Sequence, residues 1–310
     1  MPGRSGQIPH YCAMREYTLT VAGYRIRIGS VMGGPDLTPG PRFRNNITTG
    51  KGDYDLLIRV HSGKPAQHEN LRKVFHAPLI EEVGSGPARR LENFWSVYRH
   101  KSGLLLNTIF PRANDNLRGS LSYSLESPEW DLYIDGSVES FDPFEYPLDG
   151  LILYYLTVMH GDIFIHGSAV LHEGRGYLFT GVSGSGKTTM AMLWEKAGAL
   201  VIHDDRVIIR KTPEGFVMHN TPVYNDEEPR QAPLSRIFIV GHGLHNEIMT
   251  LRGANALSRI MANCIQHNWS TDLIGQLTGS LYLLIQSVPV AGYWFVPDAT
   301  AVSYALSHGN

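Results

Sequence analysis

The sequence has little cysteine, no long apolar run and no marked excess of either charge. Its two cysteines, Cys12 and Cys264, lie far apart and in no metal-ligand spacing. That usage argues against a disulfide framework or a cysteine-based zinc site and favours a reducing, cytoplasmic setting. The longest apolar candidate, residues 148–159, is shorter than the ~18 residues a membrane helix needs, and the N-terminus lacks the apolar core of a signal peptide. We therefore expect no membrane partner.

The charge balance excludes one further class of partner. Lys and Arg together number 27 against 29 Asp and Glu, a formal net charge of -2, which gives no global attraction for nucleic acid. With 43% hydrophobic residues, the 310-residue chain can bury a full core, and its length favours about two domains.

The first half of the sequence predicts a mostly β region. Residues 17–21 and 24–28 flank an Ala-Gly turn and alternate as a hairpin does. The stretch 33–53, rich in Gly, Pro, Asn and Thr, predicts a long loop or a partly disordered insertion. Further strands are expected at 56–60, 103–110, 121–125 and 130–134.

The pattern changes near residue 141, where we place a domain boundary between 1–140 and 141–310. Apolar residues between 143 and 159 recur at helical spacing. Beyond this helix, strand-like and helix-like segments alternate, which predicts an α/β core. The expected strands are 163–165, 169–172, 177–180, 201–203, 207–210, 237–240 and 293–296, and the expected helices are 188–197, 254–267 and 278–286.

One motif indicates chemistry directly. Residues 181–188 read GVSGSGKT and fit the P-loop pattern G-x-x-x-x-G-K-[ST] between a predicted strand and a predicted helix. Its glycines let successive N–H groups converge on phosphate oxygens, Lys187 adds a positive charge, and Thr188 offers a hydroxyl to Mg²⁺. The expected nucleotide-binding residues are Gly181, Ser183, Gly184, Ser185, Gly186, Lys187, Thr188 and Thr189.

A pair of carboxylates follows the next predicted strand. Residues 199–203 are mostly apolar and end in Asp204 and Asp205, which can complete Mg²⁺ coordination beside the phosphates. Neighbouring carboxylates also raise one pKa, which suits a group that accepts a proton from an attacking hydroxyl. The alternative is that the two residues merely end the strand and form a turn with Arg206.

Three blocks in order resemble the catalytic domain of the HPr serine kinase/phosphorylase family. They are His166-Gly167-Ser168, the P-loop, and Asp204-Asp205-Arg206-Val207, and the resemblance covers roughly residues 141–310. It implies a fold similar to phosphoenolpyruvate carboxykinase, with ATP and Mg²⁺ as cofactors. By the same resemblance Asp204 is the base, Lys187 and His166 stabilise the transferring phosphoryl group, and Thr188 and Asp205 lie on the metal side. Hexamers occur in the family, which leaves a homo-oligomer open.

The sequence departs from that family in two respects. The family's Glu-containing signature after the Asp pair is not recognisable, and the nearest acidic cluster, residues 225–229, is either a source of one more Mg²⁺ ligand or a solvated loop. The N-terminal half also differs. HPr-kinase-like proteins with a β-rich N-terminal part are associated with peptide modification, including lasso peptides, so we expect that half to recognise the acceptor. A further run, Gly241-His242-Gly243-Leu244-His245, could place imidazoles near the nucleotide but is too weak a pattern for zinc.

Three functions remain as hypotheses. The first is an ATP- and Mg²⁺-dependent kinase that phosphorylates an alcohol, a serine hydroxyl of a peptide, protein or small molecule. The second is a nucleotide-binding regulator without phosphotransfer, which would tolerate loss of Asp204. The third is a carboxykinase-like enzyme, suggested by the resemblance in fold alone.

Overall fold

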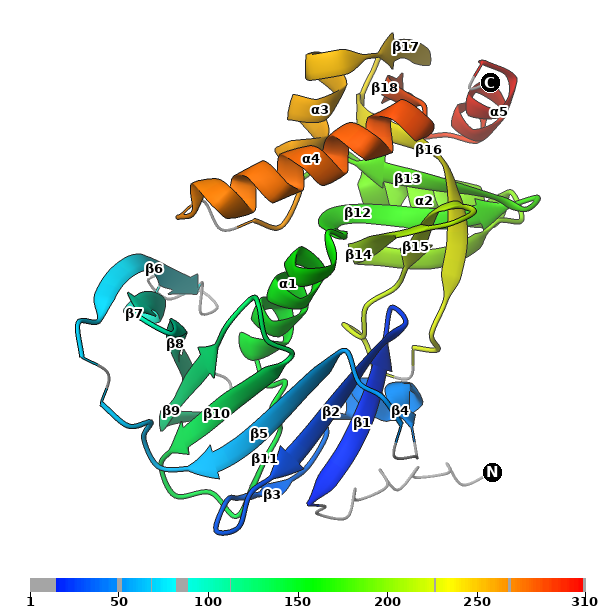
Figure 1. Ribbon diagram of the computed structural model, residues 1–310. Coiled ribbons are helices and arrows are strands. Elements are labelled where there is room, and N and C mark those ends of the chain that lie inside the picture. The colour runs from blue at the N-terminus through cyan, green and yellow to red at the C-terminus, as the bar shows by residue number, and fades with distance from the viewer. Residues whose placement is uncertain are drawn as a thin grey trace, which may run out of the picture. The chain divides into compact units, whose positions relative to one another are not determined.

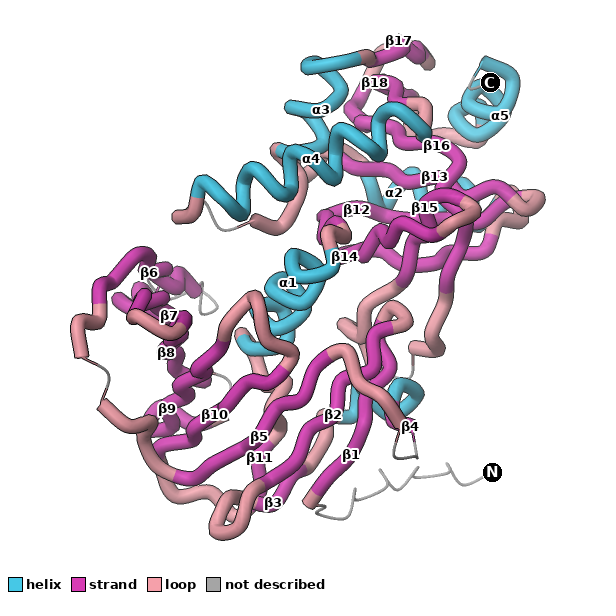
Figure 2. The backbone as a smooth tube through the Cα atoms, in the orientation of Figure 1, coloured by secondary structure: helices cyan, strands magenta, loops and turns pink. Residues whose placement is uncertain are grey.

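The computed structural model describes residues 15–48, 52–67, 69–81, 89–111, 113–225, 227–266 and 269–308. The protein is mixed α/β, with two large sheets that belong to two compact units (Figure 1, Figure 2). The first unit extends to residue 152 without 21–23, and the second comprises 21–23 and the chain from 153 onward. The division falls inside helix α1 (Leu148–His160). The domain boundary expected at residue 141 stays a prediction.

The first unit is built around a nine-stranded sheet in the order β4-β1-β2-β5-β10-β9-β8-β7-β6. The mostly β character expected for the first half is therefore confirmed. A small parallel pair, β3 with β11, accompanies the sheet. The bounds are β1 Glu16–Val21, β2 Tyr24–Ser30, β3 Asp36–Leu37, β4 Ile47–Thr48, β5 Leu56–Ser62, β6 Arg72–Glu81, β7 Arg89–His100, β8 Gly103–Phe110, β9 Asn114–Tyr123, β10 Glu129–Asp135 and β11 Ser140–Phe141.

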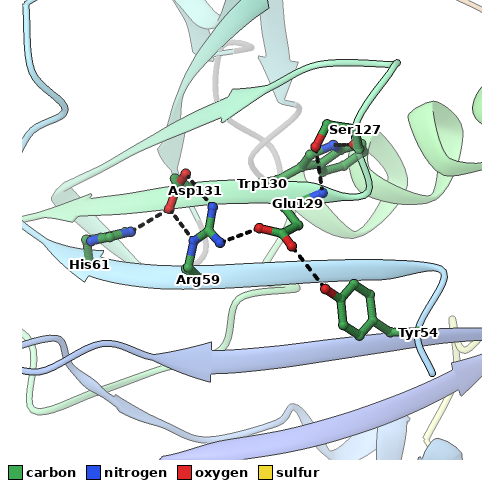
Figure 3. A network of polar contacts seen from close by, with 7 residues as sticks. All are labelled: Tyr54, Arg59, His61, Ser127, Glu129, Trp130 and Asp131. Atoms are coloured by element: carbon green, nitrogen blue, oxygen red, sulfur yellow. Dashed lines mark hydrogen bonds and ion pairs between the residues drawn. The ribbon is translucent and has the colours of Figure 1, made fainter. Parts of the chain in front are cut away.

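Strict alternation gives the central strands β5 and β10 one buried and one polar face. Ile58 and Leu132 are fully buried, because side chains two residues apart on a strand point to the same face. The opposite face carries a network of polar contacts (Figure 3). There Arg59 binds Glu129 at 2.7 Å and Asp131 at 2.9 Å, and His61 lies 2.8 Å from Asp131. Charges across the two strands thus compensate one another on the face that is not buried.

Most expectations for this half are confirmed, but β6 and β7 were not predicted and one predicted loop is wrong. The hairpin and the strands predicted at 56–60, 103–110 and 130–134 are present, and the strand predicted at 121–125 overlaps the end of β9, which spans Asn114–Tyr123. The loop predicted over 33–53 is wrong for its described part, which forms β3, the 3-10 helix η1 (Pro41–Asn46) and β4. Phe43 in η1 is fully buried and packs against Phe144, and Leu37 in β3 is also fully buried, so buried apolar side chains anchor a segment whose composition suggested a loop.

The second unit contains a seven-stranded sheet in the order β13-β12-β14-β15-β16-β18-β17, and β13 also pairs with β16. Helices cover both faces. One apolar core includes residues of α3 and α4, and the other includes residues of α2 and α5. The bounds are β12 Ile163–His172, β13 Arg175–Thr180, α2 Lys187–Lys196, β14 Leu200–Thr212, β15 Gly215–His219, β16 Gln231–His242, β17 Glu247–Leu251, α3 Gly253–Met261, α4 Thr271–Ser287, β18 Val290–Phe295 and α5 Thr300–His308.

Two expectations for the second half are wrong in a way that matters for the site. The strands predicted at 163–165 and 169–172 are one strand, β12, and those predicted at 201–203 and 207–210 are one strand, β14. Asp204 and Asp205 therefore lie inside a strand and not at its end. The reason is that β12 supplies antiparallel partners to β14 throughout this stretch, so its polar residues remain in the ladder.

The helices differ from expectation mainly in their bounds. The helix predicted at 254–267 is α3, which ends at Met261, and the one predicted at 278–286 is α4, which begins seven residues earlier at Thr271. The Ser270 hydroxyl caps α4 by accepting the N–H of Leu273. None of the described helices is both long and apolar enough to span a membrane.

Candidate functional site

The P-loop, residues 181–188, connects β13 to α2 and requires glycine at two positions. Gly184 and Gly186 have φ angles of 76° and 96°, in the left-handed region that side chains disfavour. A Cβ at Gly186 would also lie 2.7 Å from the Phe295 ring. The glycines thus permit a tight turn directly before a helix N-terminus, where unpaired N–H groups form a site for anions.

Lys187 stands at the start of α2 and folds back along the loop. Its ammonium donates to the carbonyl oxygens of Gly181 and Val182 at 2.9 and 3.0 Å. Burial lowers the pKa of Lys187, while the charges of Asp204 and Asp205 act in the opposite direction. A cation is thus held between the loop and two carboxylates.

The antiparallel pairing of β12 with β14 assembles the other half of the site. Ser168 lies opposite Asp204 in this register, and its hydroxyl donates to that carboxylate. The same Oδ1 accepts the hydroxyl of Thr188 at 3.2 Å. Asp204 is thereby bound to the very P-loop hydroxyl that the motif assigns to Mg²⁺.

Asp205 has different partners from its neighbour. Its Oδ1 lies 3.7 Å from Nδ1 of His166, and its Oδ2 lies 3.4 Å from Nε of Arg206. Burial alone would raise the pKa of Asp205, but His166 and Arg206 outweigh it and hold the pKa below its ordinary value. The expectation that adjacent carboxylates raise one pKa is therefore not met at Asp205, because each carboxylate faces its own donors.

These groups line one cavity of about 770 Å³. It brings together seven of the predicted residues: His166, Gly181, Ser183, Lys187, Thr188, Asp204 and Asp205. Gly184, Ser185, Gly186 and Thr189 belong to the loop and the first turn of α2 but are not among the residues that line it.

Among the lining residues that the sequence analysis did not assign to the site, three carry polar side chains: Ser168, Tyr224 and Asn263. Ser168 carried a signal, since it lies two residues from His166 on a strand and so shares its face. No sequence pattern indicated Tyr224 or Asn263, because both lie in loops that reach the cavity only in the folded protein. The Tyr224 hydroxyl donates to the carbonyl oxygen of Asp204 at 3.2 Å, and the carbonyl of Asn263 accepts the N–H of His166 at 3.0 Å.

The acidic cluster downstream is not simply a solvated loop. Glu227 lies 2.8 Å from Nδ1 of His203, whose side chain is completely buried, and only 12% of the Glu227 side chain is exposed. His203 also lies 3.4 Å from the hydroxyl of Thr221. Glu227 is thus engaged in a buried pair beside Asp204, and Asp226 lies outside the described residues.

The oxygen atoms that line the cavity are suitable ligands for Mg²⁺. Thr188, Asp204 and Asp205 offer hydroxyl and carboxylate oxygens, the hard ligands that Mg²⁺ prefers. Within the described ranges, no three His, Cys, Asp or Glu side chains gather into a cage for a metal. Mg²⁺ commonly binds through one or two carboxylates together with substrate phosphates, and such a site needs no cage.

Comparisons with known proteins add little to this geometry. Neither the protein-family models nor the curated proteins give a match. Among solved structures, the Hpr(Ser) kinase/phosphatase from Coxiella burnetii is similar over 47% of this chain and 99% of that chain, with 12% sequence identity and a TM-score of 0.28. A similarity this distant does not indicate the function of this protein.

Proposed function

We propose that the protein is an ATP- and Mg²⁺-dependent kinase of the HPr-kinase-like type, with a phosphoenolpyruvate carboxykinase-like core, that phosphorylates an alcohol. The acceptor is a serine hydroxyl carried by a peptide, a protein or a small molecule. One observation carries the proposal: the P-loop hydroxyl of Thr188 is hydrogen-bonded to Asp204 in the cavity that also holds Lys187 and His166. A phosphate site, a metal-side hydroxyl and a proton acceptor are the parts that phosphoryl transfer needs.

In this proposal each residue has one task. The P-loop amides and Lys187 bind the phosphate chain, and His166 stabilises charge on the transferring group. Thr188 and Asp205 would hold Mg²⁺, which when bound neutralises phosphate charge. Asp204 takes the proton of the acceptor hydroxyl. The acceptor oxygen then bonds to the γ-phosphorus as the bond from that phosphorus to the β,γ-bridging oxygen breaks, and ADP leaves.

The contacts of Asp204 also favour a second assignment of the two carboxylates. Ser168 and Thr188 both donate to its Oδ1, so Asp204 is tied to the metal-side hydroxyl, whereas Asp205 faces His166. In this second assignment Asp204 would bind Mg²⁺ and Asp205 would be the base. A metal ligand and a base respond differently to substitution, because only loss of a ligand raises the Mg²⁺ concentration required for activity.

The test is label transfer from γ-labelled ATP with Mg²⁺, read by mass spectrometry on serine-containing peptides, free serine and HPr. We expect transfer to one acceptor class and a loss of at least ~100-fold in kcat for Asp204→Asn, with ATP binding retained. Asp272→Asn, at an exposed carboxylate in the first turn of α4, serves as the control. A shift of the Mg²⁺ dependence in Asp204→Asn would support the second assignment.

One result would overturn the kinase proposal. If the wild type binds ATP and transfers no phosphoryl group to any acceptor, and Asp204→Asn binds ATP equally well, the protein is better described as a nucleotide-binding regulator.

A further inference from the structure

The neighbourhood of His242 contains contacts that the proposed chemistry does not use. His242 is the last residue of β16, and its Nε2 lies 3.0 Å from the carbonyl oxygen of Gly184 in the P-loop. A carbonyl oxygen only accepts hydrogen bonds, so Nε2 carries the proton and donates it. We propose that His242 is a positioning residue that holds the P-loop in its phosphate-binding conformation.

The strand pairing explains how β16 reaches the loop. β13 and β16 run parallel, with Thr180 opposite Ile239, and β13 ends where the loop begins. β16 continues three residues farther, to His242. A Cβ at Gly181 would lie 2.9 Å from the carbonyl oxygen of Val240, so the start of the loop rests directly on this extension.

The loop then packs onto a platform of two rings. His242 pairs in register with Phe295 of β18, and their ring centroids are 5.7 Å apart. A Cβ at Gly186 would meet both, at 2.7 Å from Phe295 and 3.2 Å from the Cε1 of His242. The platform thus touches the loop on either side of Ser185, at Gly184 through a hydrogen bond and at Gly186 through van der Waals contact.

The orientation of the Gly184 carbonyl gives this contact its function. A loop that binds an anion through N–H groups must turn its carbonyl oxygens away, because their partial negative charge repels phosphate. Three carbonyls of this loop have side-chain donors: Lys187 donates to those of Gly181 and Val182, and His242 donates to that of Gly184. Gly184 has a φ of 76°. Without His242, the carbonyl of Gly184 would lose the N–H donor that fixes the orientation of its peptide group.

Three variants of the full-length protein test the role of His242. His242→Leu removes the donor, His242→Gln keeps an amide N–H at a similar reach, and His242→Ala is a second variant without a donor. His245→Leu is the matched control, since His245 lies on the same turn with 79% of its side chain exposed. Isothermal titration with Mg²⁺-ATP and with inorganic tripolyphosphate measures binding with and without the nucleoside.

We expect His242→Leu and His242→Ala to weaken both probes about five- to tenfold, as loss of one hydrogen bond does, and His242→Gln to stay within about twofold of wild type. Amide hydrogen exchange of residues 183–186 should accelerate in the Leu and Ala variants alone. Unchanged exchange in this segment for the Leu and Ala variants would overturn the proposal, whether or not either probe binds.

The inference rests on the proposed function only in naming a nucleotide phosphate chain as the ligand. If the wild type binds both probes but phosphorylates no acceptor, the kinase proposal fails while the role of His242 stands. If transfer occurs and His242→Leu binds tripolyphosphate as the wild type does, the role of His242 fails and the kinase proposal stands.

Discussion

A buried carboxylate in the first unit predicts an unusual pH dependence of stability. Asp142 follows β11 and accepts the N–H groups of Phe144 at 2.9 Å and Gly40 at 3.2 Å. Burial raises its pKa from 3.8 to about 7, although these hydrogen bonds and Arg42 oppose the change. The folded protein therefore keeps this proton to a higher pH than the unfolded chain does. Unfolding between these values releases a proton, so stability falls as pH rises through the window.

The size of the effect follows from the two pKa values. The difference between 3.8 and about 7 corresponds to ~4 kcal/mol at ~1.4 kcal/mol per pH unit. Because Asp142 retains some exposure to water, we expect solvent to reduce this to ~2 kcal/mol. Asp142→Asn cannot ionise and should remove the slope. Below the window it should be less stable than the wild type by ~1 kcal/mol, because its amide nitrogen cannot accept a hydrogen bond, and above the window it should be the more stable of the two.

The assay must report on the first unit alone. Urea unfolding of the full chain at several pH values between about 5 and 7.5, read by a short deuterium pulse at one fixed pH, gives the unfolded fraction of β10 by mass spectrometry. The two proteins are compared by the free energy of unfolding of the first unit, and the result is its difference between wild type and Asp142→Asn at each pH. Asp36→Asn, at a carboxylate of the same unit with 48% of its side chain exposed, is the control. Parallel curves for wild type and Asp142→Asn across this range would refute the reasoning.

Three further predictions concern the second unit. Burial lowers the pKa of His219 from 6.5 to about 4, so the folded protein binds this proton more weakly than the unfolded chain does. The second unit should therefore lose stability as pH falls from about 6.5 to 4. His219→Gln should reduce this loss, measured by a deuterium pulse that reports the unfolded fraction of β15. Gly186→Ala places a methyl group 2.7 Å from Phe295 at a φ of 96° and should cost at least ~1 kcal/mol and weaken ATP binding, measured by thermal unfolding and calorimetry. Lys187→Ala should reduce nucleotide turnover about 100-fold or more in an ADP-release assay, and an unchanged rate would contradict its assigned role.

The P-loop was predictable from the sequence because its determinants are local. Three glycines, a lysine and a threonine lie within eight residues, and a strand and a helix flank them at once. The carboxylates were predictable as residues but not in their placement. Two adjacent aspartates suggest the end of a strand, and only the long-range pairing with β12 keeps Asp204 and Asp205 inside β14. That pairing also places Ser168 beside Asp204, which no local pattern reveals.

The remaining errors have the same origin. β6 and β7 were not predicted because charged and polar residues interrupt their apolar positions, yet each finds a partner along the sheet. Tyr224 and Glu227 lie in a segment whose acidic composition suggested solvent, and the buried His203 that binds Glu227 lies more than twenty residues earlier. Contacts between distant parts of the chain decided these cases, and a single sequence does not display them.

The additional pairing of β13 with β16 has a consequence for how a peptide can approach. It closes β12, β13, β14, β15 and β16 into a ring in which every strand has neighbours on both sides. Among the described strands of the second sheet, only β17 has a single neighbouring strand, whereas in the first sheet β4 and β6 do. A free edge is where an extended peptide can add itself as a further strand. β15 pairs with β14 only from Ile208 onward, and beside the two aspartates the hydroxyls of Tyr224 and Thr221 donate to the carbonyl oxygens of Asp204 and Arg206. Under the proposed function, a peptide acceptor that added itself as a strand along this stretch would have to displace both contacts.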